Sequence, residues 1–127
     1  MLTETIPETS ARQKEIVKDY LFQLDKHIND LRNGKAENTF EIKDFAGLLH
    51  IHPTHLSNTI NEVLQQSPCD LYENKLVNLA KELLKDTNLP IAEIARQLFF
   101  DPSNFTKYFK RYAGTTPKQY RNEQSKI

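Results

Sequence analysis

Apolar side chains recur at helical spacing between residues 90 and 121. A first stripe is followed, after a short break, by a second one built from Phe105 and Phe109. An apolar residue at every third or fourth position is typical of an amphipathic helix with one buried face. Because a helix-turn-helix joins its helices by only about three residues, the two helices must cross steeply, and a small residue lets them approach closely. The first stripe supplies one: it consists of Ile91, Ile94, Ala95 and Leu98.

Residues that start and stop helices mark the ends of this motif. Asp101 and Thr116 suit the N-cap position, and Thr116 forms a capping box with Gln119. Gly114 can adopt the left-handed conformation that ends the middle helix. Three prolines occupy places where the first residue of a helix is expected, namely Pro90, Pro102 and Pro117. Segment 88–127 is therefore predicted to be a helix-turn-helix followed by a C-terminal helix.

The same pattern occurs a second time, 49 residues earlier. His52-Pro53 corresponds to Asp101-Pro102, so the turn has the same length. An internal repeat of this kind indicates two copies of one supersecondary unit. Segment 38–66 is predicted to be a first helix-turn-helix, with helices at about residues 40–49, capped by Asn38 with Glu41, and at residues 53–64. The matching apolar positions are Ile42, Phe45, Ala46, Leu49, Leu56 and Ile60.

A single long helix is predicted between the two copies, in segment 67–87. Ser67 precedes Pro68 as an N-cap, and the helix is expected to run to about Lys85. Leucines on two of its sides would face both helix-turn-helix units. We expect this helix to act as a rigid spacer.

Another long helix is predicted ahead of the repeat, in segment 1–37, from Pro7 or Glu8 to Leu31. In one interpretation its second half packs on the first helix-turn-helix and its first half is solvated. In the other, Ile16, Tyr20 and their neighbours stay exposed for dimerisation or for docking to a sensor domain. The apolar stripe comprises Val17, Tyr20, Leu21, Leu24, Ile28 and Leu31. The predicted fold is all-α with about seven helices.

Composition and charge narrow the class of protein. No apolar run approaches the ~20 residues of a membrane span and no leader pattern is present, so we expect a cytoplasmic protein with no membrane partner. A single cysteine fits a reducing compartment. The net charge is zero, but residues 101–127 hold 6 basic and 2 acidic side chains, whereas residues 1–100 hold 11 and 15. Positive charge is thus collected on the second helix-turn-helix, where the phosphates of a nucleic acid would lie.

The chain resembles the DNA-binding domain of the AraC/XylS family of bacterial transcription regulators. The resemblance covers about residues 38–122 and is most specific in the second copy, at residues 94–95, 98–105, 109–111 and 114–121, with residues 49–57 and 80–84 matching upstream. It implies two helix-turn-helix units joined by a linker helix. It also implies that the domain is usually joined to an effector-sensing or receiver domain.

Three positions depart from the family pattern. Phe99 stands where the second turn usually has glycine, and this turn is one residue shorter. The Gln65-Gln66 region replaces the glycine that usually ends the first recognition helix, and Leu76 stands where arginine is usual. These departures concern the tilt of the recognition helices and leave the expected fold unchanged.

The exposed face of the second recognition helix is the main candidate for DNA contacts. A helix in the major groove reads base edges with its N-terminal turns and touches phosphates further along. Asn can bond adenine, Ser and Thr are permissive, and Lys can donate to guanine. The alternative is an ordinary solvated polar face. The candidate residues are Ser103, Asn104, Thr106, Lys107, Lys110 and Arg111.

The last helix and the first recognition helix supply further candidates. Lys118 and Arg121 lie near a helix N-terminus that suits a phosphate, although solvated charge explains them equally well. The first recognition helix has a polar face without Lys or Arg. The family resemblance implies that it reads DNA, and a mainly structural unit with weak contacts stays open. Its face comprises Thr54, His55, Ser57, Asn58 and Asn61.

The sequence gives little reason to expect chemistry. His50, His52 and His55 have no Cys or carboxylate ligand close in sequence, so no metal is expected. Cys69 lacks a second cysteine and does not indicate a redox switch. No phosphate-binding loop, nucleophile motif or carboxylate pair is present. We therefore expect no enzyme and no cofactor.

These observations predict a sequence-specific double-stranded DNA-binding transcription regulator. Two recognition helices would enter major-groove segments about one helical turn, or ~34 Å, apart. Expected partners besides DNA are RNA polymerase or a sensor domain, and a second copy bound through the N-terminal helix. The rival hypothesis is a helix-turn-helix scaffold that binds protein, which the zero net charge and the acidic first copy favour. Target sequence, activation or repression, inducing signal and full-length architecture do not follow from the sequence.

Overall fold

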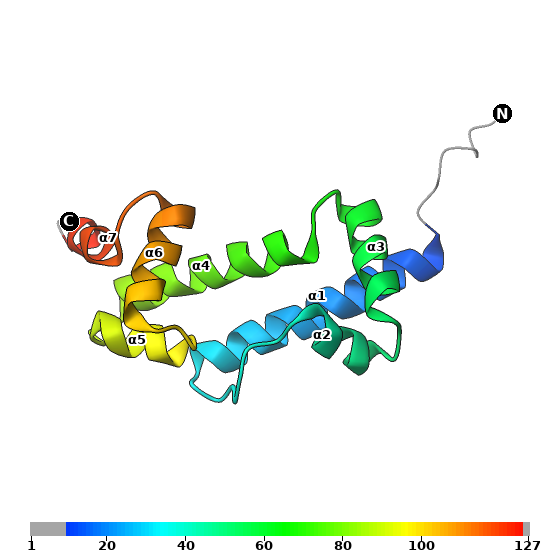
Figure 1. Ribbon diagram of the computed structural model, residues 1–127, viewed down its shortest axis with the longest axis horizontal. Coiled ribbons are helices and arrows are strands. Elements are labelled where there is room, and N and C mark those ends of the chain that lie inside the picture. Colours follow the sequence, from blue (N-terminus) through cyan, green and yellow to red (C-terminus); the bar gives the residue numbers. More distant parts are fainter. Residues whose placement is uncertain (1–9, 126–127) are drawn as a thin grey trace. The chain divides into compact units, whose positions relative to one another are not determined.

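The computed structural model describes residues 10–125, and this part of the chain contains seven α-helices and no strand. The helices are α1 (Ala11–Arg32), α2 (Ile42–Leu49), α3 (Pro53–Leu64), α4 (Pro68–Asp86), α5 (Ile91–Gln97), α6 (Pro102–Ala113) and α7 (Pro117–Gln124) (Figure 1). The predicted all-α class and both helix pairs of the repeat are confirmed. The start expected at Pro7 or Glu8 lies outside the described residues.

The chain forms two compact units, and two helices contribute to both. Unit 1 comprises residues 40–71 with the chain up to Lys26, and unit 2 comprises residues 27–39 with the chain from Tyr72 onward. Unit 1 therefore holds α2 and α3, and unit 2 holds α5, α6 and α7. Helices α1 and α4, predicted as an N-terminal extension and a spacer, are each divided between the units.

In unit 1 the first part of α1 covers the helix pair α2–α3. The Tyr20 ring packs edge-on against Phe45, with centroids 5.3 Å apart, and Phe40 lies 5.2 Å from the same ring. Ile16 and Tyr20 are only 2% and 1% exposed. The interpretation that leaves these two side chains exposed for a partner is therefore wrong. The solvated part of α1 is shorter than the other interpretation expects, because residues 11–15 are exposed or half-buried and burial begins at Ile16. The spacing of apolar residues shows which face of a helix is buried, but not how far along the helix its cover extends.

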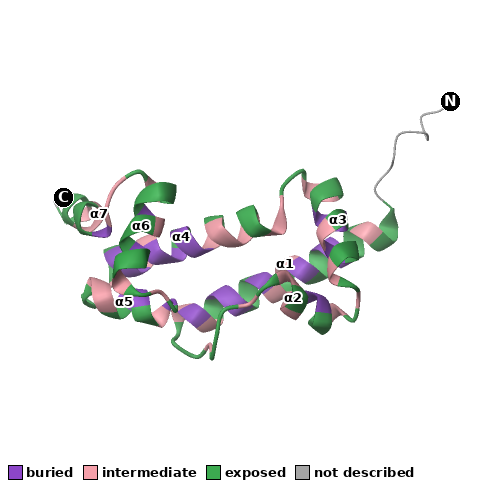
Figure 2. Cartoon of the chain, in the orientation of Figure 1, coloured by how far each residue is buried: buried purple, intermediate pink, exposed green. Residues whose placement is uncertain are grey.

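In unit 2 the core is built from α4, α5 and α6, with the last turns of α1. Phe105 and Phe109 of α6 are fully buried, as are Ile94 and Ala95 of α5. Ala95 lies on the buried face of α5, and α5 contacts α6. The buried stripes of α1 and α4 are visible in Figure 2.

Helix starts follow local capping, with two corrections. Pro90 is the N-cap of α5 and not, as predicted, its first residue. Ser10 and Gln13 form a capping box at the start of α1, with Gln13 N–H donating to Ser10 Oγ (3.0 Å) and Ser10 N–H to Gln13 Oε1 (2.9 Å). The prediction that Asn38 caps α2 is wrong: the N-cap is Glu41, whose N–H donates to the Asp44 carboxylate at 2.7 Å. Glu41 is extended (φ −106°, ψ 173°) and Phe40 packs on Phe45, so the helix begins later than its sequence pattern.

Candidate nucleic-acid interface

Helix α6 has a firmly capped start. The Asp101 carboxylate accepts hydrogen bonds from Ser103 Oγ (2.6 Å) and Ser103 N–H (3.2 Å), and Pro102 occupies the first helical position. The Ser103 hydroxyl contributes most to lowering the pKa of this exposed carboxyl. The cap fixes the backbone at the end of the helix that is expected to enter a major groove.

The exposed face of α6 contains every residue predicted for it. Phe105 and Phe109 anchor the opposite face in the core, so the polar side chains point to solvent. Thr106 Oγ1 donates to the Pro102 carbonyl (3.3 Å), so its hydroxyl oxygen can still accept a hydrogen bond. The residues that the fold brings together here are Ser103, Asn104, Thr106, Lys107, Lys110 and Arg111, all exposed. Their arrangement gives hydrogen-bonding groups in the first turns and cations further along.

A row of stacked aromatic rings holds α6 in place. Phe100 stacks on Tyr108 with centroids 4.7 Å apart, and Tyr108 lies 5.1 Å from Tyr112. Tyr108 OH donates to the backbone carbonyl of Glu73 in α4 (2.9 Å). Burial raises the pKa of Tyr108 and that of Glu73, so the phenol stays a neutral donor at physiological pH. The helix is thus locked by rings and a hydrogen bond on the side away from its polar face.

The two predicted cations of α7 have different surroundings. Lys118 lies exposed in the first turn, beside the Thr116–Gln119 capping box that the structure confirms. Arg121 is half-buried and donates to the carbonyls of Leu84 (3.0 Å) and Thr87 (3.3 Å) at the C-terminal end of α4. Its guanidinium thus satisfies helix-end carbonyls, a use that charge and position in the sequence did not reveal.

The corresponding face in unit 1 is polar and uncharged. Thr54, His55, Asn58 and Asn61 are exposed on α3, and Ser57 is half-buried. Asn61 Nδ2 donates to the Ser57 carbonyl at 2.9 Å. His52, which the sequence places only in a turn, is the N-cap of α3, and its Nδ1 accepts from Thr54 N–H at 3.1 Å. Its match to Asp101 in the repeat was the signal for this role.

Three non-glycine residues of the described chain have positive φ, and each ends a helix: His50 (59°), Gln65 (56°) and Phe99 (66°). Phe99 and Gln65 occupy the regions where the family pattern has glycine, and Phe99 is 46% exposed. The left-handed turn is therefore kept although the residue that adopts it most easily is absent.

Residues 10–125 contain no metal-binding cluster of side chains and no membrane-spanning helix. No group of three His, Cys, Asp or Glu side chains in this part could hold a metal ion. None of its helices is long and apolar enough to cross a membrane. Cys69 is exposed.

Comparison with known proteins agrees with the two helix pairs. A family model described as a helix-turn-helix domain matches residues 45–123. An uncharacterised HTH-type transcriptional regulator of Bacillus subtilis, YfiF, is 33% identical over 102 residues, which are 80% of this chain and 31% of that protein. The arabinose operon regulatory protein of Escherichia coli is 31% identical over 87 residues, or 68% of this chain and 30% of that protein. The chain thus spans about a third of these relatives.

A solved structure shares the fold. It is a transcriptional regulator from Chromobacterium violaceum described as having an AraC-type DNA-binding domain, with a TM-score of 0.74 and 17% identity. The match covers 92% of this chain and 98% of that one. Because it extends beyond the repeat, the arrangement of helices within each unit is common to both proteins.

Proposed function

Since the chain belongs to the AraC/XylS family of helix-turn-helix transcription regulators, we propose that it binds double-stranded DNA at a specific sequence. The observation that supports this most is the face of α6. It combines exposed Ser103, Asn104 and Thr106 in the first turns with cations one turn later, on a helix whose start and buried side are both fixed. Such a face serves to read bases and to neutralise phosphates.

We propose a division of labour among the candidate residues. Asn104, with Ser103, Thr106 and Lys107, contacts base edges, whereas Lys110, Arg111 and Lys118 contact phosphates and set the register. Arg121 already donates to the carbonyls of Leu84 and Thr87, so its role is to attach α7 to the end of α4 and not to contact a phosphate. Helix α3 reads a second block of bases through Thr54, His55, Ser57, Asn58 and Asn61.

The wider role is also a proposal. The relatives are about three times as long as the matched region, which supports a DNA-binding domain that works together with a sensor domain. In this role the protein acts in the cytoplasm on RNA polymerase and catalyses no reaction.

The test is selection of random duplex DNA by the purified protein, followed by sequencing. Two enriched blocks centred about ten base pairs apart would support both recognition helices. A single block that disappears with Asn104→Ala would leave α3 as a scaffold. Absence of enrichment, with weak binding that salt does not change, would refute the proposal.

A protein-binding scaffold is the second candidate, and one observation favours it. Helix α3 presents no Lys or Arg on its exposed face, and it carries Glu62 where α6 carries Arg111. A surface of this charge gains little from phosphates. The same selection experiment separates the two functions.

A further inference from the structure

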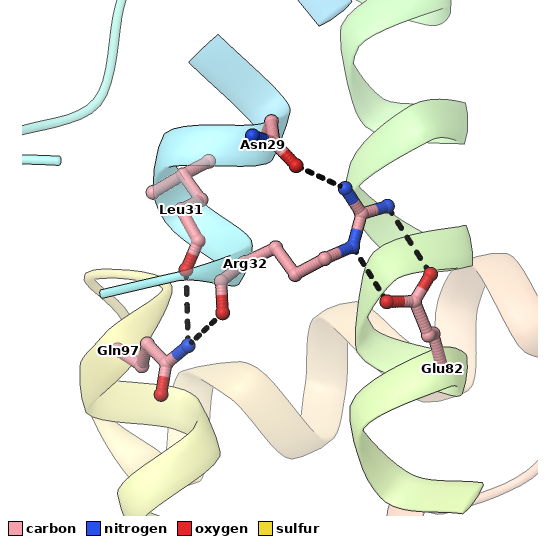
Figure 3. A network of polar contacts seen from close by, with 5 residues as sticks. All are labelled: Asn29, Leu31, Arg32, Glu82 and Gln97. Carbon is pink, nitrogen blue, oxygen red and sulfur yellow. Dashed lines mark hydrogen bonds and ion pairs between the residues drawn. The ribbon is translucent and has the colours of Figure 1, made fainter. Parts of the chain in front are cut away.

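The last turn of α1 forms a bridge between α4 and α5 within unit 2 (Figure 3). On one side, Arg32 Nε and Nη2 donate to the two carboxylate oxygens of Glu82 in α4, at 2.6 and 3.1 Å. Arg32 Nη1 also donates to Asn29 Oδ1 (2.9 Å), and this third hydrogen bond fixes the orientation of the guanidinium. A bidentate pair of this kind fixes orientation as well as distance.

On the other side the bridge reaches α5 through Gln97. Its Nε2 donates to the carbonyls of Leu31 (3.0 Å) and Arg32 (2.9 Å) in the last turn of α1, and the Leu31 carbonyl also accepts from Gly34 N–H at 3.2 Å. Leu31 is itself fully buried. The Gln97 amide thus connects the last turn of α1 to the end of α5.

Gln97 lies close in sequence to the start of α6, so its contact with α1 affects where α6 begins. It is the last residue of α5, and Asp101, the cap of α6, follows four positions later. A shift of the end of α5 is therefore passed directly to the start of α6. Helix α6 is also hydrogen-bonded directly to α4, through Tyr108 and the Glu73 carbonyl. Helix α4 is therefore connected to α6 directly and to α5 through the last turn of α1.

We propose that Gln97, Arg32 and Glu82 are positioning residues for the recognition helix α6, acting through the last turn of α1. This inference rests on the proposed DNA-binding function. It assigns to a helix outside the repeat the task of setting how α6 presents Asn104 and Lys107. A purely structural role would change stability but leave the sequence preference of the folded protein intact.

The main test is a charge exchange measured in the whole chain. Arg32→Glu and Glu82→Arg each break the bridge but change net charge in opposite directions, and the double variant restores both the pair and the charge. We expect each single variant to lose about five- to tenfold of discrimination at the base block that Asn104→Ala relaxes, and the double variant to regain it. If one single variant only weakens and the other only strengthens binding to all sequences, bulk charge explains the data and the inference is wrong.

Gln97→Ala tests the second half of the bridge without a change of charge. Its matched control is Asn78→Ala, which removes an exposed amide from α4 in the same unit. We expect Gln97→Ala to reduce discrimination at the α6 block at a temperature where the protein is fully folded, and Asn78→Ala to leave it unchanged. Equal discrimination in the two variants would overturn the assignment.

Amide hydrogen exchange keeps the inference testable apart from DNA. Breaking the bridge should speed exchange in α5 and α6, leave α2 and α3 unchanged, and be reversed in the double variant. If the unmodified protein shows no sequence preference, the proposed function fails, and exchange alone decides whether the bridge positions α6. Unchanged exchange in the single variants would refute the bridge whatever the DNA result.

Discussion

The two helix-turn-helix units repeat one backbone but not one surface. Hydrogen bonds recur at the 49-residue offset: Ile51 N–H donates to Ala46 O, as Phe100 N–H does to Ala95 O, at 3.1 and 2.8 Å. Gln65 N–H donates to Asn61 O, and Gly114 N–H to Lys110 O, both at 2.9 Å. The left-handed positions coincide as well, His50 with Phe99 and Gln65 with Gly114.

The exposed faces differ where the backbones agree. Lys107, Lys110 and Arg111 of α6 correspond to Asn58, Asn61 and Glu62 of α3. Glu62 is also used within its own unit, since its carboxylate accepts from Gln13 Nε2 at 2.8 Å. Fold and charge thus vary independently in the repeat. The buried positions are similar in both units, whereas only unit 2 carries cations at these outer positions.

The largest expected effect comes from the buried positions that the units share. Phe105→Ala should cost about 3–5 kcal/mol and Leu56→Ala about 2–5 kcal/mol, because both side chains are fully buried and truncation leaves a cavity. Urea denaturation followed by circular dichroism measures both. A cost near zero for either variant would mean that its unit is not packed as described.

Exchanging the two faces should have the next largest effect. Replacing Lys107, Lys110 and Arg111 by Asn, Asn and Glu should weaken binding to all DNA sequences by about a hundredfold at moderate salt. The slope of log affinity against log salt should flatten by about 0.9 for each phosphate that the protein no longer neutralises. The reciprocal change in α3 should steepen it. Equal slopes in all variants would show that Lys110 and Arg111 do not touch phosphates.

Asn104→Ala and its counterpart His55→Ala separate base recognition in the two units. We expect Asn104→Ala to lose about 1–3 kcal/mol of discrimination at one or two base pairs, and His55→Ala to lose less because α3 lacks the neighbouring cations. Competition binding with single-base variants of the selected site measures this. Unchanged base preference in Asn104→Ala would contradict its proposed role.

The two left-handed helix ends allow a reciprocal exchange of smaller effect. Gln65→Gly should stabilise the protein by about 1 kcal/mol and Gly114→Gln should destabilise it by a similar amount, since a side chain strains this conformation. A Cβ at Gly114 would meet nothing within 4 Å, so the loss would come from backbone strain alone. Thermal melts of both variants measure the difference, and changes of the same sign would refute the explanation.

The smallest expected effect is a loss of stability at acidic pH, when the Asp101 cap is protonated. The folded pKa of Asp101 lies below its ordinary value, so this cap stabilises α6 above the unfolded pKa and is lost as pH falls through the lowered folded one. Asp101→Asn should remove that part of the pH dependence. NMR titration of the Asp101 carboxyl checks the direction, and an ordinary or raised pKa would contradict it.

Local signals predicted the helices well, and long-range contacts account for what they missed. Pro53, Pro102 and Pro117 mark helix starts because proline acts on its own backbone. By contrast, the two carbonyls that Arg121 binds lie 37 and 34 residues away, and no spacing rule connects them. The polar faces of α3 and α6 could be predicted because the opposite faces are apolar, whereas base contacts depend on a partner outside the chain.

The division of α1 between the units bears on where a functional fragment can be cut. The matched family region begins at residue 45, after α1 has already supplied Ile16, Tyr20 and Leu24 to one core and Ile28 and Leu31 to the other. A fragment trimmed to that region would leave Phe45 without the Tyr20 ring, and Glu82 and Gln97 without their partners. The family model therefore begins after a helix that contributes to both cores.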